Sequence, residues 1–118
     1  MPVRGIRGAT TTRRDDPETI LAATRELLEA VVAANGIAPD DIASAIFTVT
    51  PDLTSEFPAR AARSLGWEHV ALLGATEMAV PHGPPRCIRV LVHVNTDRAP
   101  RALKHIYLHG AQDLRPDR

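Results

Sequence analysis

The longest helical pattern in the chain covers residues 15–36. Its apolar side chains recur at the spacing of one helix face, and they are Ile20, Leu27, Leu28, Val31 and Val32. Asp16 can cap the helix, Pro17 suits its first turn, and Gly36 suits the position after its last turn. These signals predict an amphipathic helix with one face buried.

Five other segments have the apolar or alternating pattern of β-strands. They are residues 2–12, 44–50, 70–74, 86–96 and 103–110. Between and after them we expect a helical turn from Pro39, a short helix over 58–65, a loop over 81–85 and a polar tail from residue 111. Gly5 and Gly8 allow a close backbone approach or a bulge in the first strand. Because strands and helices mix without strict β–α–β alternation, we predict a single α+β domain over residues 1–118, with a mixed sheet packed with helices.

The segment CIRVLVHV, residues 87–94, has the strongest strand pattern and raises a question about its arginine. Side chains of a strand alternate between faces. One face is wholly apolar, which suits packing against the long helix. The other face holds Cys87, Arg89, Leu91 and His93. A guanidinium stays charged, and burying it without a partner would be very costly. The first strand carries a similar cation, Arg7.

Two interpretations of these strand arginines remain open from the pattern alone. Arg7 and Arg89 either pair with structural carboxylates or reach the edge of the sheet. Alternatively they form an anion site, because the guanidinium fork can bind a carboxylate at two points. Arg60 and Arg63 lie one turn apart on the predicted short helix, where a solvated face is the simpler interpretation.

Composition excludes several classes of partner. The formal net charge is zero, so there is no basic excess for nucleic acid and no polybasic run for a membrane surface. No apolar stretch approaches the roughly 18 residues of a membrane span, and the start MPVRGIRGAT lacks the apolar core of a signal peptide. The single Cys87 excludes an internal disulfide. Together these features favour a soluble cytoplasmic protein.

The sequence has no motif for nucleophilic, metal or phosphate chemistry. Its five histidines show no metal-ligand spacing, and GxSxG, P-loop and GxGxxG motifs are absent. Cys87 is more typical of core filler than of a nucleophile. Glu77 is an isolated acid after the third predicted strand, and the default interpretation is that it is an exposed loop residue.

Six segments, taken in order, resemble the AroH class of chorismate mutases nearly from end to end. They are VRGIRGATT, TPDLTSEFPARAAR, TEM, CIRV, HIYL and LRPD. The resemblance implies a mixed-sheet subunit that assembles as a homotrimeric pseudo-α/β barrel, with active sites between neighbouring subunits. It also implies conversion of chorismate to prephenate, on the route to phenylalanine and tyrosine, without a cofactor or metal.

The resemblance further assigns individual residues. It places Arg89 beside the ether bond that breaks and Glu77 at the ring hydroxyl. Arg7 and Tyr107 match the groups that bind the side-chain carboxylate. The remaining implied substrate-binding residues, several of them from the adjacent subunit or the closing tail, are Phe57, Ala59, Arg60, Arg63, Leu72, Leu73, Gly74, Leu114 and Arg115.

The chain departs from the family pattern at a few positions. Gly74 stands where the family often has Cys or Ser, Leu73 replaces a polar residue, and Arg60 replaces a more usual Lys. Compared with relatives that read Ser-Gly-Trp, this chain also lacks one residue before Trp67. These departures concern pocket detail rather than activity. A non-catalytic trimer that binds a small dicarboxylate is the alternative, and loss of chorismate absorbance would distinguish the two.

Overall fold

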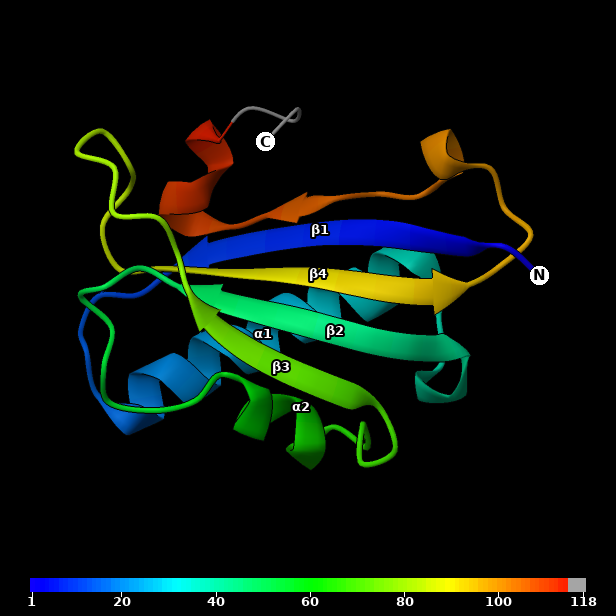
Figure 1. Cartoon of the computed structure of the whole chain (residues 1–118), viewed down its shortest axis with the longest axis horizontal. Helices are drawn as coiled ribbons and strands as arrows, with labels where there is room; N and C mark the ends of the chain where they lie inside the picture. Colours follow the sequence, from blue (N-terminus) through cyan, green and yellow to red (C-terminus); the bar gives the residue numbers. More distant parts are fainter. Residues whose placement is uncertain (115–118) are drawn as a thin grey trace.

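The computed structural model describes residues 1–114, which form a single five-stranded sheet. The strands are β1 (Val3–Thr11), β2 (Ile42–Val49), β3 (Ala71–Thr76), β4 (Cys87–Asn95) and β5 (Ile106–Tyr107). Their order across the sheet is β3-β2-β4-β1-β5 (Figure 1). β4 pairs antiparallel with β1 and β2, whereas β3 and β5, at the two edges, pair parallel with their neighbours. The predicted α+β class with a mixed sheet is confirmed.

The two α-helices, α1 (Pro17–Asn35) and α2 (Ala59–Ser64), cover one face of the sheet (Figure 1). Both predicted caps of α1 are confirmed. The Asp16 carboxylate accepts the Thr19 N–H at 2.8 Å, and Gly36 adopts a left-handed φ of 60°. Among the described residues no helix combines the length and the apolar character needed to cross a membrane.

The buried face of α1 is more polar than its predicted apolar stripe. Its buried residues are Ile20, Thr24, Leu27, Leu28, Val31 and Asn35. The predicted Val32 is only half-buried. Thr24 and Asn35 tolerate burial because they donate hydrogen bonds to backbone oxygens one turn earlier, and Asn35 also bonds the backbone of Lys104.

The main core lies between α1 and the sheet, and Gly8 lets the two approach closely. A Cβ atom at Gly8 would lie 3.1 Å from Val90 Cγ1 and 3.2 Å from Leu27 Cδ1. The predicted close approach at this glycine is therefore confirmed. The bulge occurs elsewhere, in β2 between Ile42 and Ser44. The apolar face of β4 is buried in this core as predicted, through Ile88, Val90, Val92 and Val94.

The fifth strand is much shorter than the predicted 103–110, because side chains replace its main-chain ladder. Asn35 accepts the Lys104 N–H and donates to the Lys104 carbonyl, at 2.7 and 3.0 Å. The ring of His105 accepts the Arg7 N–H. After Tyr107 the chain turns into a 3₁₀ helix, η3 (His109–Asp113). Ala111 is fully buried there, so the expected polar tail from residue 111 is also wrong at its start.

Strand β3 is an edge strand, and apolar side chains on and near it are exposed. Leu73 is 63% exposed, and nearby Phe57 and Met78 are 73% and 78% exposed. The opposite edge is short and is followed by η3, which packs against β1. An uncovered apolar edge of this kind favours contact with another chain.

Candidate active site

The face of the sheet that faces away from α1 carries the strand arginines, which strand pairing brings close together. Arg89 on β4 lies opposite Ala9 of β1 and Thr48 of β2. Arg7 lies opposite Leu91, two pairs further along the same ladder and therefore on the same face. Directly opposed residues of an antiparallel pair share a face. Arg89 is thus flanked by a small side chain on one side and a hydroxyl on the other.

Glu77 joins this face from the chain that leaves β3. Its N–H donates to the Val49 carbonyl at 2.8 Å, which directs the side chain back over β2. Its Oε2 accepts a hydrogen bond from Thr48 Oγ1 at 2.7 Å and lies 3.7 Å from Arg89 Nε. The Glu77 side chain is 24% exposed, so the default interpretation of an exposed loop residue is wrong.

A cavity of about 240 Å³ lies over these residues. Its lining includes Arg7, Ala9, Ile46, Thr48, Glu77, Arg89, Leu91, Tyr107 and Leu114. Two buried polar atoms here, Arg89 Nε and Tyr107 Oη, have no hydrogen-bond partner within residues 1–114. Buried donors without partners are costly, so the cavity is suited to a ligand that supplies acceptors.

A small apolar cluster supports the part of the cavity lined by Ala9, Tyr107 and Leu114. Tyr107 and Leu114 pack against the buried residues Ala9, Cys87 and Ala111. Burial raises the pKa of the Cys87 thiol, although the charge of Arg89 partly opposes this. The interpretation of Cys87 as core filler is therefore confirmed by its burial.

Sequence reasoning missed two residues that support the cavity. Thr48 holds Glu77, and His105 accepts the Arg7 main-chain N–H on Nδ1 at 2.9 Å. Burial lowers the pKa of His105, and the positive charge of Arg7 lowers it further. Side chains alternate along β2, so Thr48 shares a face with Ile46 and lies opposite the face of the buried Phe47. No sequence signal indicated that it lies opposite Arg89.

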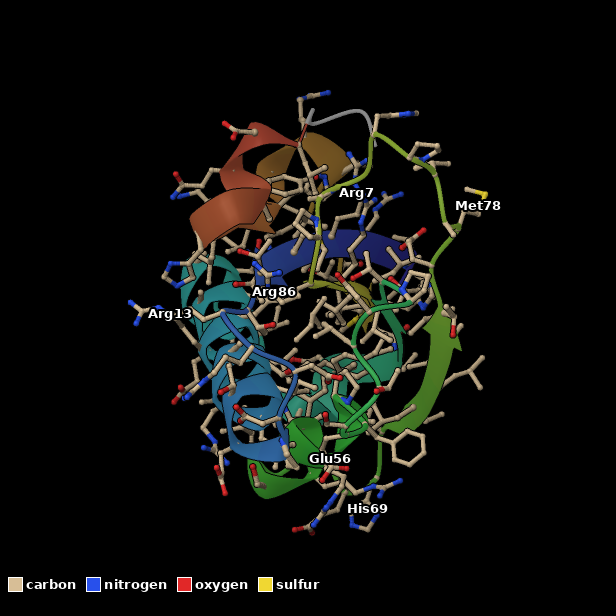
Figure 2. The ribbon with its side chains drawn as sticks, turned by 90° about the vertical axis from the view of Figure 1, so that its left-hand side faces the viewer. Arg7, Arg13, Glu56, His69, Met78 and Arg86 are labelled. Carbon is tan, nitrogen blue, oxygen red and sulfur yellow. The ribbon has the colours of Figure 1, made fainter. Side chains whose placement is uncertain are left out.

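The other expected substrate-binding residues lie apart from this cavity in the same subunit. Phe57 and Gly74 line a separate hollow of about 380 Å³ between β3 and the segment before α2. Neither hollow is lined by Ala59, Arg60, Arg63, Leu72 or Leu73. Figure 2 shows Arg7 toward one side of the molecule and Glu56, the ion-pair partner of Arg60, toward the other. The expected Arg115 lies outside the described residues.

The charges of the cavity define the chemistry that it can perform. Arg7 and Arg89 offer guanidinium donors, Glu77 offers a carboxylate acceptor and Tyr107 offers a hydroxyl. This set can hold a small molecule that has carboxylate and hydroxyl groups. Within the described part of the chain, no three His, Cys, Asp or Glu side chains gather as a metal site would require.

Comparisons with known proteins agree along almost the whole chain. The family model described as "Chorismate mutase type I" matches residues 3–118. "Chorismate mutase AroH" of Thermus thermophilus is 54% identical over 116 residues, which cover 98% of this chain and 95% of that protein. The Bacillus subtilis protein of the same name is 44% identical over 118 residues, covering 99% and 93%. A solved chorismate mutase from Clostridium thermocellum superposes with a TM-score of 0.92 at 48% identity, covering 93% of this chain and 98% of its own.

Proposed function

The chain belongs to the type I chorismate mutase family, and from that premise we propose that Arg89 stabilises the charge that develops when chorismate rearranges to prephenate. The chain is thus an isomerase. The alternative of a non-catalytic dicarboxylate-binding trimer is not supported, because the curated relatives named above are chorismate mutases.

The reaction sets two physical requirements. It is an intramolecular [3,3] rearrangement in which no proton moves and no nucleophile attacks. The enzyme must hold a flexible dianion in its compact reactive conformer, and it must stabilise negative charge on the ether oxygen as the C–O bond breaks. Only an interaction that strengthens in the transition state accelerates the chemical step.

The unpartnered Arg89 Nε is the observation that carries the proposal. It is buried on a central strand, and the carboxylate oxygen that pairs with it, Glu77 Oε2, lies at 3.7 Å, too far for a hydrogen bond. Glu77 thus balances the charge of Arg89 without occupying this donor. A donor fixed in this way needs no reorganisation when the ether oxygen gains charge.

The other lining residues suit further groups of the substrate. Arg7 and Tyr107 come from strands that pair side by side, which suits a clamp on the side-chain carboxylate. Glu77 accepts a hydrogen bond from Thr48 through Oε2, and its carboxylate suits the ring hydroxyl as a further donor. Leu114 covers the apolar part of the ring.

We propose that a second subunit completes each site, in a homotrimer. The cavity described above contains no residue from 57–74, although the resemblance assigns this segment to substrate binding. Phe57 and Leu73 lie exposed at the β3 edge instead, where they can cover a neighbour's cavity. In that arrangement Arg63 of the neighbour attracts the second carboxylate, and Arg60 adds positive charge near it.

Mixing two defective variants tests this shared site. Arg89→Gln and Arg63→Ala are made separately, unfolded together in equal amounts and refolded. If each site takes Arg89 from one subunit and Arg63 from the next, random assembly leaves about a quarter of the sites with both native residues. The mixture should then regain about a quarter of the wild-type rate of chorismate loss.

The same experiment has clear controls. Each variant refolded alone should stay defective, and the two mixed without unfolding should show only their average. A refolded mixture that also shows only this average would mean that each site takes Arg63 and Arg89 from the same subunit, and would reject the shared cleft. Sedimentation of a stable, active monomer would reject the trimer.

A further inference from the structure

We propose that His105 is a positioning residue for substrate binding, acting as the hydrogen-bond acceptor that fixes the main chain of Arg7 beside Tyr107. The proposal rests on the carboxylate clamp assigned above to Arg7 and Tyr107. His105 itself does not line the cavity, so its effect passes through these two residues.

The geometry of β1 and β5 carries the inference. Their ladder pairs Gly8 with Ile106 and Ala9 with Tyr107, and the Leu108 N–H donates to Ala9. The next main-chain donor along β1, the Arg7 N–H, bonds the His105 ring at 2.9 Å instead of a carbonyl. One ring nitrogen therefore fixes Arg7 against the strand that carries Tyr107.

This bond specifies the state of the ring. Nδ1 accepts, so the proton of the neutral imidazole lies on Nε2. A second proton would place an N–H at Nδ1 against the N–H of Arg7, and two donors cannot bond each other. Protonation would therefore release the main chain of Arg7 from the segment that holds Tyr107.

Burial and the neighbouring charge of Arg7 both favour the neutral form of the His105 ring. Burial lowers the pKa of His105, and Arg7 lowers it further. Arg4, the other charged residue of β1, bonds the Arg98 carbonyl. On the half of α1 that packs near β5, Glu26 pairs with His109, and Glu29 is exposed. The folded pKa lies below the ordinary value, so the bond is present at neutral pH and is lost as pH falls through the folded pKa.

Two substitutions separate the acceptor from the bulk of the ring. His105→Asn can place an amide oxygen near the position of Nδ1 and cannot titrate in this range, whereas His105→Leu has no acceptor. KM of the Leu variant should rise about fivefold, as expected when one hydrogen bond that holds the clamp is lost, with kcat within about twofold. The Asn variant should keep both constants near wild type.

The pH profile supplies a second readout. Below pH 6.5, the unshifted value for histidine, KM of the wild type should rise as His105 takes up a proton, and KM of His105→Asn should not. His69→Asn is the matched control, because His69 is exposed and lies far from Arg7 (Figure 2). It should keep the wild-type profile.

Each result bears on one assignment. If Arg7→Gln keeps the wild-type KM, the clamp itself is wrong. If Arg7→Gln raises KM but His105→Leu does not, or if His105→Asn is as defective as His105→Leu, the role of His105 is rejected. If His105→Leu does not fold, the ring ¹⁵N shifts of the wild-type protein decide. A proton on Nδ1 at pH 7.5 rejects the inference, and a proton on Nε2 alone supports it.

Discussion

Replacing Arg89 with Gln removes a positive charge from the centre of the sheet while keeping a polar side chain of shorter but similar shape. The fold should tolerate the change. The Arg89 and Glu77 side chains are 29% and 24% exposed and 3.7 Å apart, so losing this ion pair costs about 1 kcal/mol or less. Thr48 still holds Glu77 in place.

The effect on the chemical step should be much larger. A full charge at a hydrogen-bond distance of about 3 Å, acting on about half a unit of charge gained by the ether oxygen, contributes about 3 kcal/mol at an effective dielectric of about 20. This equals about 10²-fold in rate. Substrate affinity should fall only modestly, because the carboxylate contacts remain.

Single-turnover measurement with excess enzyme is the appropriate assay, because slow product release cannot then hide the defect. Arg101→Gln is the matched control, since Arg101 is exposed in the short 3₁₀ helix η2 (Pro100–Ala102) and does not line the cavity. A folded Arg89→Gln protein whose chemical step runs near the wild-type rate would refute the electrostatic role. Arg89 would then be a structural partner of Glu77.

Three further predictions concern the rest of the site and the loop beside it. Glu77→Gln should keep part of the activity while Glu77→Ala loses more, because an amide can still bond the ring hydroxyl; two equally active variants in the chorismate assay would return Glu77 to a structural role. Gly74→Ser should fold normally, since a Cβ there meets no atom within 4 Å, and should lower KM if the hydroxyl reaches the substrate of a neighbouring site. Asp15 accepts hydrogen bonds from Ser55 and Thr54 that lower its pKa, so the Tm advantage of wild type over Asp15→Asn should be full above about pH 3.8 and shrink as pH falls through the folded pKa; a pH-independent gap in thermal unfolding would contradict this.

The sequence predicted much of this architecture where local rules act alone. The alternation along β4 separated the apolar residues from the face of Arg89, and Asp16, Pro17 and Gly36 marked the ends of α1 correctly. Such signals depend on neighbours along the chain. They overestimated the length of β5, because the Asn35 side chain, distant in the sequence, binds the backbone of Lys104, and the His105 ring takes the Arg7 N–H that a longer ladder would use.

The sequence pattern alone predicted less of the candidate site than of the fold. Arg89 and Arg7 stood out as cations in strands, but Glu77 looked like a loop residue, because its position depends on the parallel pairing of β2 with β3. The resemblance identified Glu77 and Tyr107 where pattern did not. Their closeness to Arg89 follows from strand order, which a single sequence does not specify.

The interior position of β1 in the sheet has a consequence for synthesis on the ribosome. β1 is made first, yet both of its neighbours in the sheet, β4 and β5, are made last. A nascent chain therefore carries Arg7 with no partner strand until β4 has been made, and with its second neighbour missing until translation has passed Tyr107. Such long-range pairing is slow to form. A product that ends before His105 lacks one side of the carboxylate clamp and leaves β1 as a bare edge. Premature termination in this gene should then yield aggregation-prone fragments rather than weak enzymes.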